Sequence, residues 1–80
     1  MAKYDPLREH LRKDGSRRIT MTFEQIGVLV DGLPPSAFEY RQWWENQAAD
    51  THVNADAWMA AGYRVATVDL TAKRVTFEQQ

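Results

Sequence analysis

The chain begins with a pattern of apolar positions that predicts one short amphipathic helix. Leu7 and Leu11 are four residues apart, so a helix places both side chains on one face. Asp5 is the expected N-cap, and Pro6 is then at the first helical position, where proline is favoured. Gly15 follows at the position where glycine commonly ends a helix. The segment therefore predicts a helix that packs through its leucines.

The next segment changes from helical spacing to strict alternation. In residues 17–23, RRITMTF, Ile19 and Met21 lie on one side and their polar neighbours on the other, which predicts a half-buried strand. Thr22 and Gln25 then have the spacing of a capping box, in which each side chain bonds the backbone of the other residue. A second helix is expected to begin directly after this strand.

A third helix is predicted over residues 36–47, after a Pro-Pro pair that no helix can continue through. Ser36 and Glu39 have the spacing of a second capping box. With 100° per residue, the core face holds Ala37, Tyr40 and Trp44, and Trp43 lies at its boundary.

The remaining pattern predicts a short helix over residues 54–61 and a C-terminal hairpin, 63–70 and 74–78, with its turn at 71–73. We expect an α+β fold with three to four helices and a three-stranded antiparallel sheet, formed by the first strand and the hairpin. With the short helix over 54–61 set aside, this order of elements is that of a winged helix-turn-helix. Residues 1–80 are expected to form this single domain.

Composition adds few constraints. Eighty residues, 44% of them hydrophobic and 26% charged, fit one globular domain, and the absence of cysteine excludes disulfides and thiolate metal sites. The net charge of −1 gives no general attraction to nucleic acid. No stretch of the sequence resembles a signal peptide or a membrane span, so we expect a cytoplasmic protein without a membrane partner.

The outward face of the third helix is the first candidate site. Arg41, Gln42 and Asn46 carry the side chains that pair with guanine or adenine edges in a major groove, and Ser36 with the first-turn N–H groups could meet a phosphate. The same residue types are common on any solvated helix, and glutamates on this helix repel phosphates. Phe38 also points outward, where it could contact a thymine methyl, another protein, a dimer mate or a covering loop.

Two clusters of basic residues are candidate phosphate contacts. One lies before and at the first strand, and the other lies at the tip of the hairpin, which in a winged fold approaches the DNA backbone. Ordinary solubilising charge is the alternative explanation of both clusters. The residues concerned are Arg17 and Arg18 in the first cluster and Lys73 and Arg74 in the second.

Nothing in the sequence indicates catalysis, a metal or a cofactor. His10 lies on the first helix and His52 in a connector, and their spacing matches no shared metal motif. No nucleophile with a partner base and no phosphate-cradling glycine loop is present. We therefore expect a protein without enzymatic activity, cofactor or metal.

The chain also resembles a small uncharacterised bacterial domain of unknown function. The resemblance runs from Tyr4 to Phe77 through YDPLREHL, ITMTFEQIGVLV, LPPSA, WWEN, AWMAAGYRV, VDL and RVTF. That domain occurs alone and attached to longer proteins, some of them nuclease or restriction related, which implies an association with nucleic acids. The stretch after Ser36 is often basic in that family, whereas this chain has Phe38 and Glu39. The positions of this chain that match the family pattern are Ser36, Ala37, Trp43, Trp44, Asn46, His52, Ala57 and Trp58.

Two functions therefore stand as hypotheses. The first is a double-stranded DNA-binding module, with helix 36–47 in the major groove and the 69–75 hairpin tip on the backbone. Trp43, at the boundary of the helix face, is a further candidate DNA contact of this module. The second is a protein-interaction module, a dimerisation unit or a regulator of a larger protein, that binds through Phe38 and Trp43.

Overall fold

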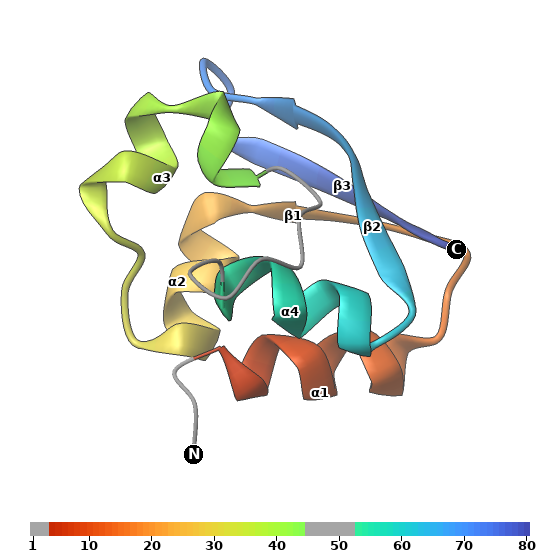
Figure 1. Cartoon of the computed structure of the whole chain (residues 1–80). Helices are drawn as coiled ribbons and strands as arrows, with labels where there is room; N and C mark the ends of the chain where they lie inside the picture. Colours follow the sequence, from red (N-terminus) through yellow and green to blue (C-terminus); the bar gives the residue numbers. More distant parts are fainter. Residues whose placement is uncertain (1–3, 45–52) are drawn as a thin grey trace.

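The computed structural model describes residues 4–44 and 53–80, which form four α-helices and one small sheet (Figure 1). The helices are α1 (Asp5–Asp14), α2 (Phe23–Val30), α3 (Pro35–Glu39) and α4 (Val53–Ala60), with a single 3-10 turn, η1 (Arg41–Trp44), after α3. The strands are β1 (Arg18–Thr22), β2 (Tyr63–Asp69) and β3 (Arg74–Gln79).

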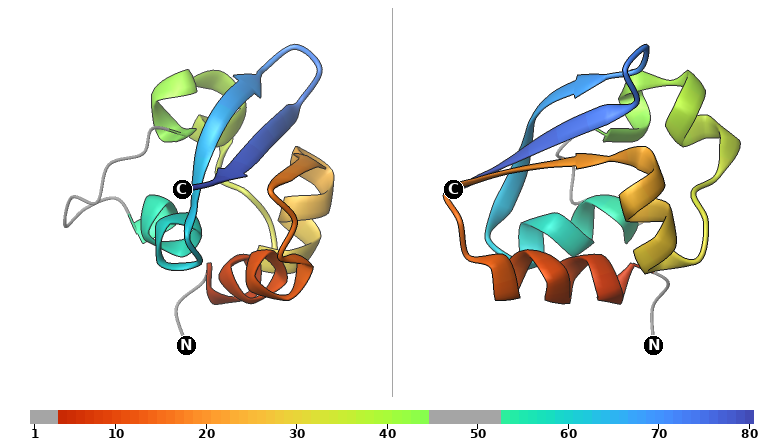
Figure 2. Two further views of the ribbon diagram at one scale, coloured as in Figure 1. Left: turned by 90° about the vertical axis from the view of Figure 1, so that its right-hand side faces the viewer. Right: turned by 180° about the vertical axis from the view of Figure 1, so that it is seen from behind.

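The sheet is antiparallel with the order β1-β3-β2, so the first strand joins the C-terminal hairpin as the sequence predicted. Ile19 and Met21 of β1 are buried, as are Val75 and Phe77 of β3, and they share the face toward the helices. Helices α1 and α4 lie side by side beneath this face (Figure 2). The opposite face of the sheet is polar.

Most of the local signals act as predicted, with shifts of one residue at some helix ends. Gly15 ends α1 in the left-handed region with a φ of 66°. The residue that precedes α1 is Tyr4, so the prediction of Asp5 as the N-cap was wrong by one position. Helix α4 runs from Val53 to Ala60, so each end lies one residue before the predicted 54–61.

The capping box at the start of α2 is confirmed. The Gln25 N–H donates to the Thr22 hydroxyl at 3.1 Å, and the Thr22 N–H donates to the Gln25 side-chain oxygen at 2.9 Å. This box fixes the direct passage from β1 into α2 without a connecting loop.

Thr22→Ala is expected to lower the free energy of unfolding by about 0.5–2 kcal/mol, because the variant leaves the first turn of α2 without its side-chain acceptor. Urea unfolding followed by circular dichroism measures this loss. Thr71→Ala, in the exposed hairpin turn, is the matched control and should change stability little. Equal midpoints for the two variants would show that the capping box does not stabilise the fold.

The largest difference between the structure and the sequence prediction is in the third helix. The prediction of a continuous helix over 36–47 was wrong. Helix α3 ends at Glu39, and the backbone of Tyr40 is extended, with φ −121° and ψ 118°. Helix α3 begins at Pro35 after Pro34 and has no side-chain cap, so the predicted second capping box does not form.

The break after α3 is stabilised by Trp44. Its indole N–H donates to the Ala37 carbonyl at 2.9 Å in a buried hydrogen bond, so this carbonyl has a partner although the helix has ended. The Trp44 ring also stacks on Phe23, with ring centroids 4.9 Å apart, and on Trp58 at 5.9 Å. The predicted burial of Ala37 and Trp44 is therefore confirmed, although a broken helix achieves it.

The same break turns Tyr40 outward. Its side chain was predicted to be in the core, and this was wrong, because Tyr40 is 56% exposed. An extended residue takes a different direction from the one that a continuous helical wheel assigns. Trp43 is half-buried and packs edge-on against Trp44 at 4.6 Å, which confirms its predicted boundary position. The break therefore lets both tryptophans contact the core and leaves a tyrosine on the surface.

Candidate nucleic-acid interface at the hairpin turn

The turn between β2 and β3 is held in one shape by local hydrogen bonds. The Asp69 carboxylate accepts the N–H groups of Thr71 and Ala72, each at 3.0 Å. Lys73 then adopts the left-handed region, with a φ of 57°, and its carbonyl accepts the Phe23 N–H at 2.9 Å. The turn is therefore tied to the first residue of α2.

Helix α3 lies against this turn through one aromatic side chain. The Lys73 ammonium lies 5.9 Å from the centroid of the Phe38 ring, within the range of a cation–π contact. Phe38 packs in turn edge-on against the buried Phe23 at 5.4 Å and stays 39% exposed. The predicted hairpin tip and the predicted third helix thus meet at one end of the molecule (Figure 1).

The described contact residues predicted for the third helix are divided between α3 and η1. Arg41 and Gln42 are exposed on η1, and Ser36 is half-buried in α3. Asn46, like His52, lies outside the described residues. The exposed Tyr40 is the surface residue that sequence reasoning missed, because no signal in the sequence marked the break that exposes it. We call Phe38, Tyr40, Arg41, Gln42, Lys73 and Arg74 the α3–turn surface.

The charges at this end are nearly balanced. Arg41, Lys73 and Arg74 are exposed cations, and Glu39 and Asp69 are exposed carboxylates close to them in sequence. A few phosphates could be neutralised by the three cations, but the carboxylates weaken the local positive potential.

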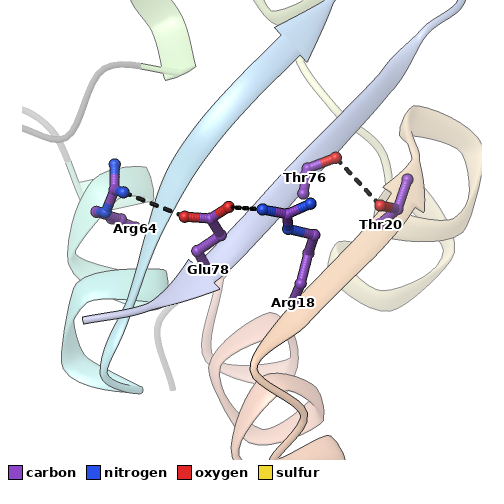
Figure 3. Close-up of polar contacts among 5 residues, drawn as sticks. All are labelled: Arg18, Thr20, Arg64, Thr76 and Glu78. Carbon is purple, nitrogen blue, oxygen red and sulfur yellow. Dashed lines mark hydrogen bonds and ion pairs between the residues drawn. The ribbon is translucent and has the colours of Figure 1, made fainter.

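Arg17 and Arg18 lie at the opposite end of the sheet. In the register of the strands, Arg18 is opposite Glu78 and Thr22 is opposite Arg74. These two pairs of opposite residues are four positions apart along β1, which is roughly 14 Å. Arg18 and Arg64 both form ion pairs with Glu78 on the polar face of the sheet (Figure 3). The two predicted basic clusters therefore do not form one surface.

Two groups away from the α3–turn surface have altered pKa values. Burial raises the pKa of the Tyr4 phenol above its usual value. Hydrogen bonds from Ser16 hold the pKa of the exposed Asp14 carboxyl below its usual range. Within residues 4–44 and 53–80, no three acidic or histidine side chains gather to hold a metal ion. No helix in this part of the chain has the length and apolar character to cross a membrane.

Comparison with known families assigns the chain to one of them. The sequence pattern of one family, a domain of unknown function named DUF7662, matches residues 4–80. The chain belongs to this family. No curated protein and no solved structure matches it.

Proposed function

We propose that this DUF7662 domain is a winged-helix module that binds double-stranded DNA through the α3–turn surface. The supporting observation is the contact between Phe38 and Lys73, which brings the hairpin turn beside α3 and η1. In a winged helix the hairpin is the wing, and it contacts the backbone next to the groove that the third helix enters. The strand order β1-β3-β2 fits this architecture.

The broken helix gives the two parts of the surface different roles. Arg41 and Gln42 on η1 are the exposed side chains that suit contacts with base edges, since guanidinium and amide groups can bond purines bidentately. Lys73 and Arg74 at the turn suit phosphate contacts, which add affinity without sequence information. With about three cations engaged, the logarithm of the affinity should fall with the logarithm of salt concentration at a slope of roughly −2 to −3.

A titration of the protein with a mixed-sequence 20-base-pair duplex, at low and at near-physiological salt, tests this proposal. Tryptophan fluorescence reports binding, because Trp43 is half-buried beside Arg41 and Gln42. We expect saturable quenching at low salt that weakens as salt rises. Lys73→Ala should weaken binding to every sequence and reduce the salt slope by about 1. Arg41→Ala should cost about 1–3 kcal/mol on a preferred sequence once one is selected.

Arg17→Ala is the matched control for these variants. It removes the same charge from an exposed position at the other end of the sheet, so DNA binding should hardly change. No fluorescence response at low salt would exclude DNA as the ligand. Equal losses for Arg17→Ala and Lys73→Ala would mean that net charge, and not the α3–turn surface, drives the binding.

A protein partner is the second candidate, and the exposure of Tyr40 and Phe38 favours it. Tyrosine and arginine are enriched among the residues that dominate binding energy at protein interfaces, and Tyr40 lies next to Arg41. A protein contact through these aromatic residues should be nearly independent of salt. A photo-crosslinking amino acid at position 40 should then capture a discrete partner in cells, and the same group at the exposed position 9 on α1 should not.

A further inference from the structure

A second surface is a groove between α1, β1 and α2. The groove has a volume of about 380 Å³. Apolar side chains line much of it, with Met21 from β1 and Leu29 from α2 at its base. Val28, which also lines the groove, is 80% exposed. Apolar area of this kind is available to a partner.

The groove runs beside a free strand edge. Strand β1 is at the border of the sheet, because the strand order is β1-β3-β2. The Gln79 N–H donates to the Arg17 carbonyl and the Phe23 N–H to the Lys73 carbonyl, both at 2.9 Å. Since hydrogen-bonded positions alternate along an antiparallel pair, Ile19 and Met21 bond β3 through their backbones.

The intervening residues of β1 therefore present their backbones to the outside. The N–H and C=O groups of Arg18 and Thr20 point away from β3, whereas the Thr22 N–H is already bonded to Gln25. No described residue bonds the outward groups of Arg18 and Thr20. The spacing of two residues is the one that an added strand requires for a continuous ladder.

Charge at one end of the groove indicates the kind of strand that fits. Asp14, at the end of α1, lines the groove, and the Ser16 N–H donates to its carboxylate at 3.1 Å. This bond favours the ionised form, so the groove carries a negative charge at neutral pH. In an added strand, alternate side chains would enter the groove and the others would lie over the polar face of the sheet beside Thr20 and Thr76 (Figure 3).

We propose that the edge of β1 binds an extended segment of a partner protein, which adds to the sheet as a fourth strand. Two side chains of this partner segment enter the groove. One is apolar and packs against Val28, and the other is basic and pairs with the Asp14 carboxylate. The residues between them are small and polar, as the outer face requires. This inference is independent of DNA binding, because it uses a different surface and a different ligand.

The test is a titration of the ¹⁵N-labelled protein with a blocked peptide of sequence Lys-Thr-Val-Thr-Lys, which presents the same pattern in both strand directions. The amide signals of Arg18 and Thr20 should shift saturably. The peptide Glu-Thr-Val-Thr-Glu is the matched control and should not bind. Asp14→Asn should weaken binding of the lysine peptide about two- to fivefold, and Val28→Asp should weaken it further.

Thr20→Pro removes one outward N–H and should abolish the shift of the remaining Arg18 amide, whereas Thr20→Ala keeps this N–H and should retain both shifts. Proline is tolerated on an edge strand where its N–H would face away from the sheet, and Val28→Asp tests the same site if the proline variant does not fold. Equal binding of the two peptides, or shifts that miss Arg18 and Thr20, would overturn the proposal. Concentration-dependent protection of these two amides without peptide would also overturn it, because a second copy would then occupy the edge.

Discussion

Replacing Trp44 with alanine is expected to lower the free energy of unfolding by about 3–5 kcal/mol. The side chain is 1% exposed and stacks between Phe23 and Trp58, so its removal leaves a large cavity. It also leaves the Ala37 carbonyl without its buried donor. A domain of this length has a total stability of roughly 4–12 kcal/mol. Urea unfolding followed by circular dichroism should show that much or most of this stability is lost.

Two further variants separate the causes of that loss. Trp44→Phe keeps an aromatic ring in the stack but removes the indole N–H, and it should cost about 1–3 kcal/mol through the unpaired Ala37 carbonyl, in addition to a smaller packing loss. Trp43→Ala removes the same type of side chain from the adjacent half-buried position and should cost clearly less than Trp44→Ala. Similar midpoints for the two alanine variants would contradict the central role of Trp44.

The second large effect is expected at Tyr63, the first residue of β2. Tyr63→Ala should lower the free energy of unfolding by about 3–5 kcal/mol, because the ring is 1% exposed. Its hydroxyl donates to the Ser16 carbonyl at 2.6 Å and accepts the Gln79 side-chain amide at 3.3 Å. That amide also donates to the Gly15 carbonyl at 2.9 Å. Tyr63 thus joins the α1–β1 connection to the end of β3.

Tyr63→Phe isolates the hydroxyl from the ring. It should cost about 1 kcal/mol, since Ser16 is exposed and its carbonyl can bond water in the variant. Hydrogen exchange should accelerate at the amide of Gln79 next to the lost contact, while the centre of β3 stays protected. Unfolding midpoints that coincide for Tyr63→Phe and Tyr63→Ala would show that the ring adds little and the hydroxyl network dominates.

The proposed DNA site and the proposed peptide site differ in how far the sequence predicted them. Arg41, Gln42, Lys73 and Arg74 were expected at a surface, because polar residue types and hairpin tips indicate exposure without knowledge of the tertiary structure. Phe38 was expected there because helical spacing placed it opposite the core face. The groove beside β1 was not predicted. Its lining comes from three separate elements, and the outward direction of the Arg18 and Thr20 backbones depends on the register with β3.

Local signals determined most of the elements of this protein. The alternation of Ile19 and Met21 set the buried face of β1, and the capping box of Thr22 and Gln25 set the start of α2. Gly15 set the end of α1. Each of these signals acts between residues a few positions apart, so the local sequence contains all of the interacting groups.

Only the tertiary structure decided where α3 ends. Helical spacing predicted a continuous helix through Tyr40, because local propensities favour it. The aromatic rings of Phe23 and Trp58, which are distant in sequence, instead hold Trp44 in a stack, and the Trp44 indole bonds the carbonyl that the break frees. Burial of a tryptophan contributes more free energy than the few backbone bonds of one short helix. Tyr40 became a surface residue for that reason.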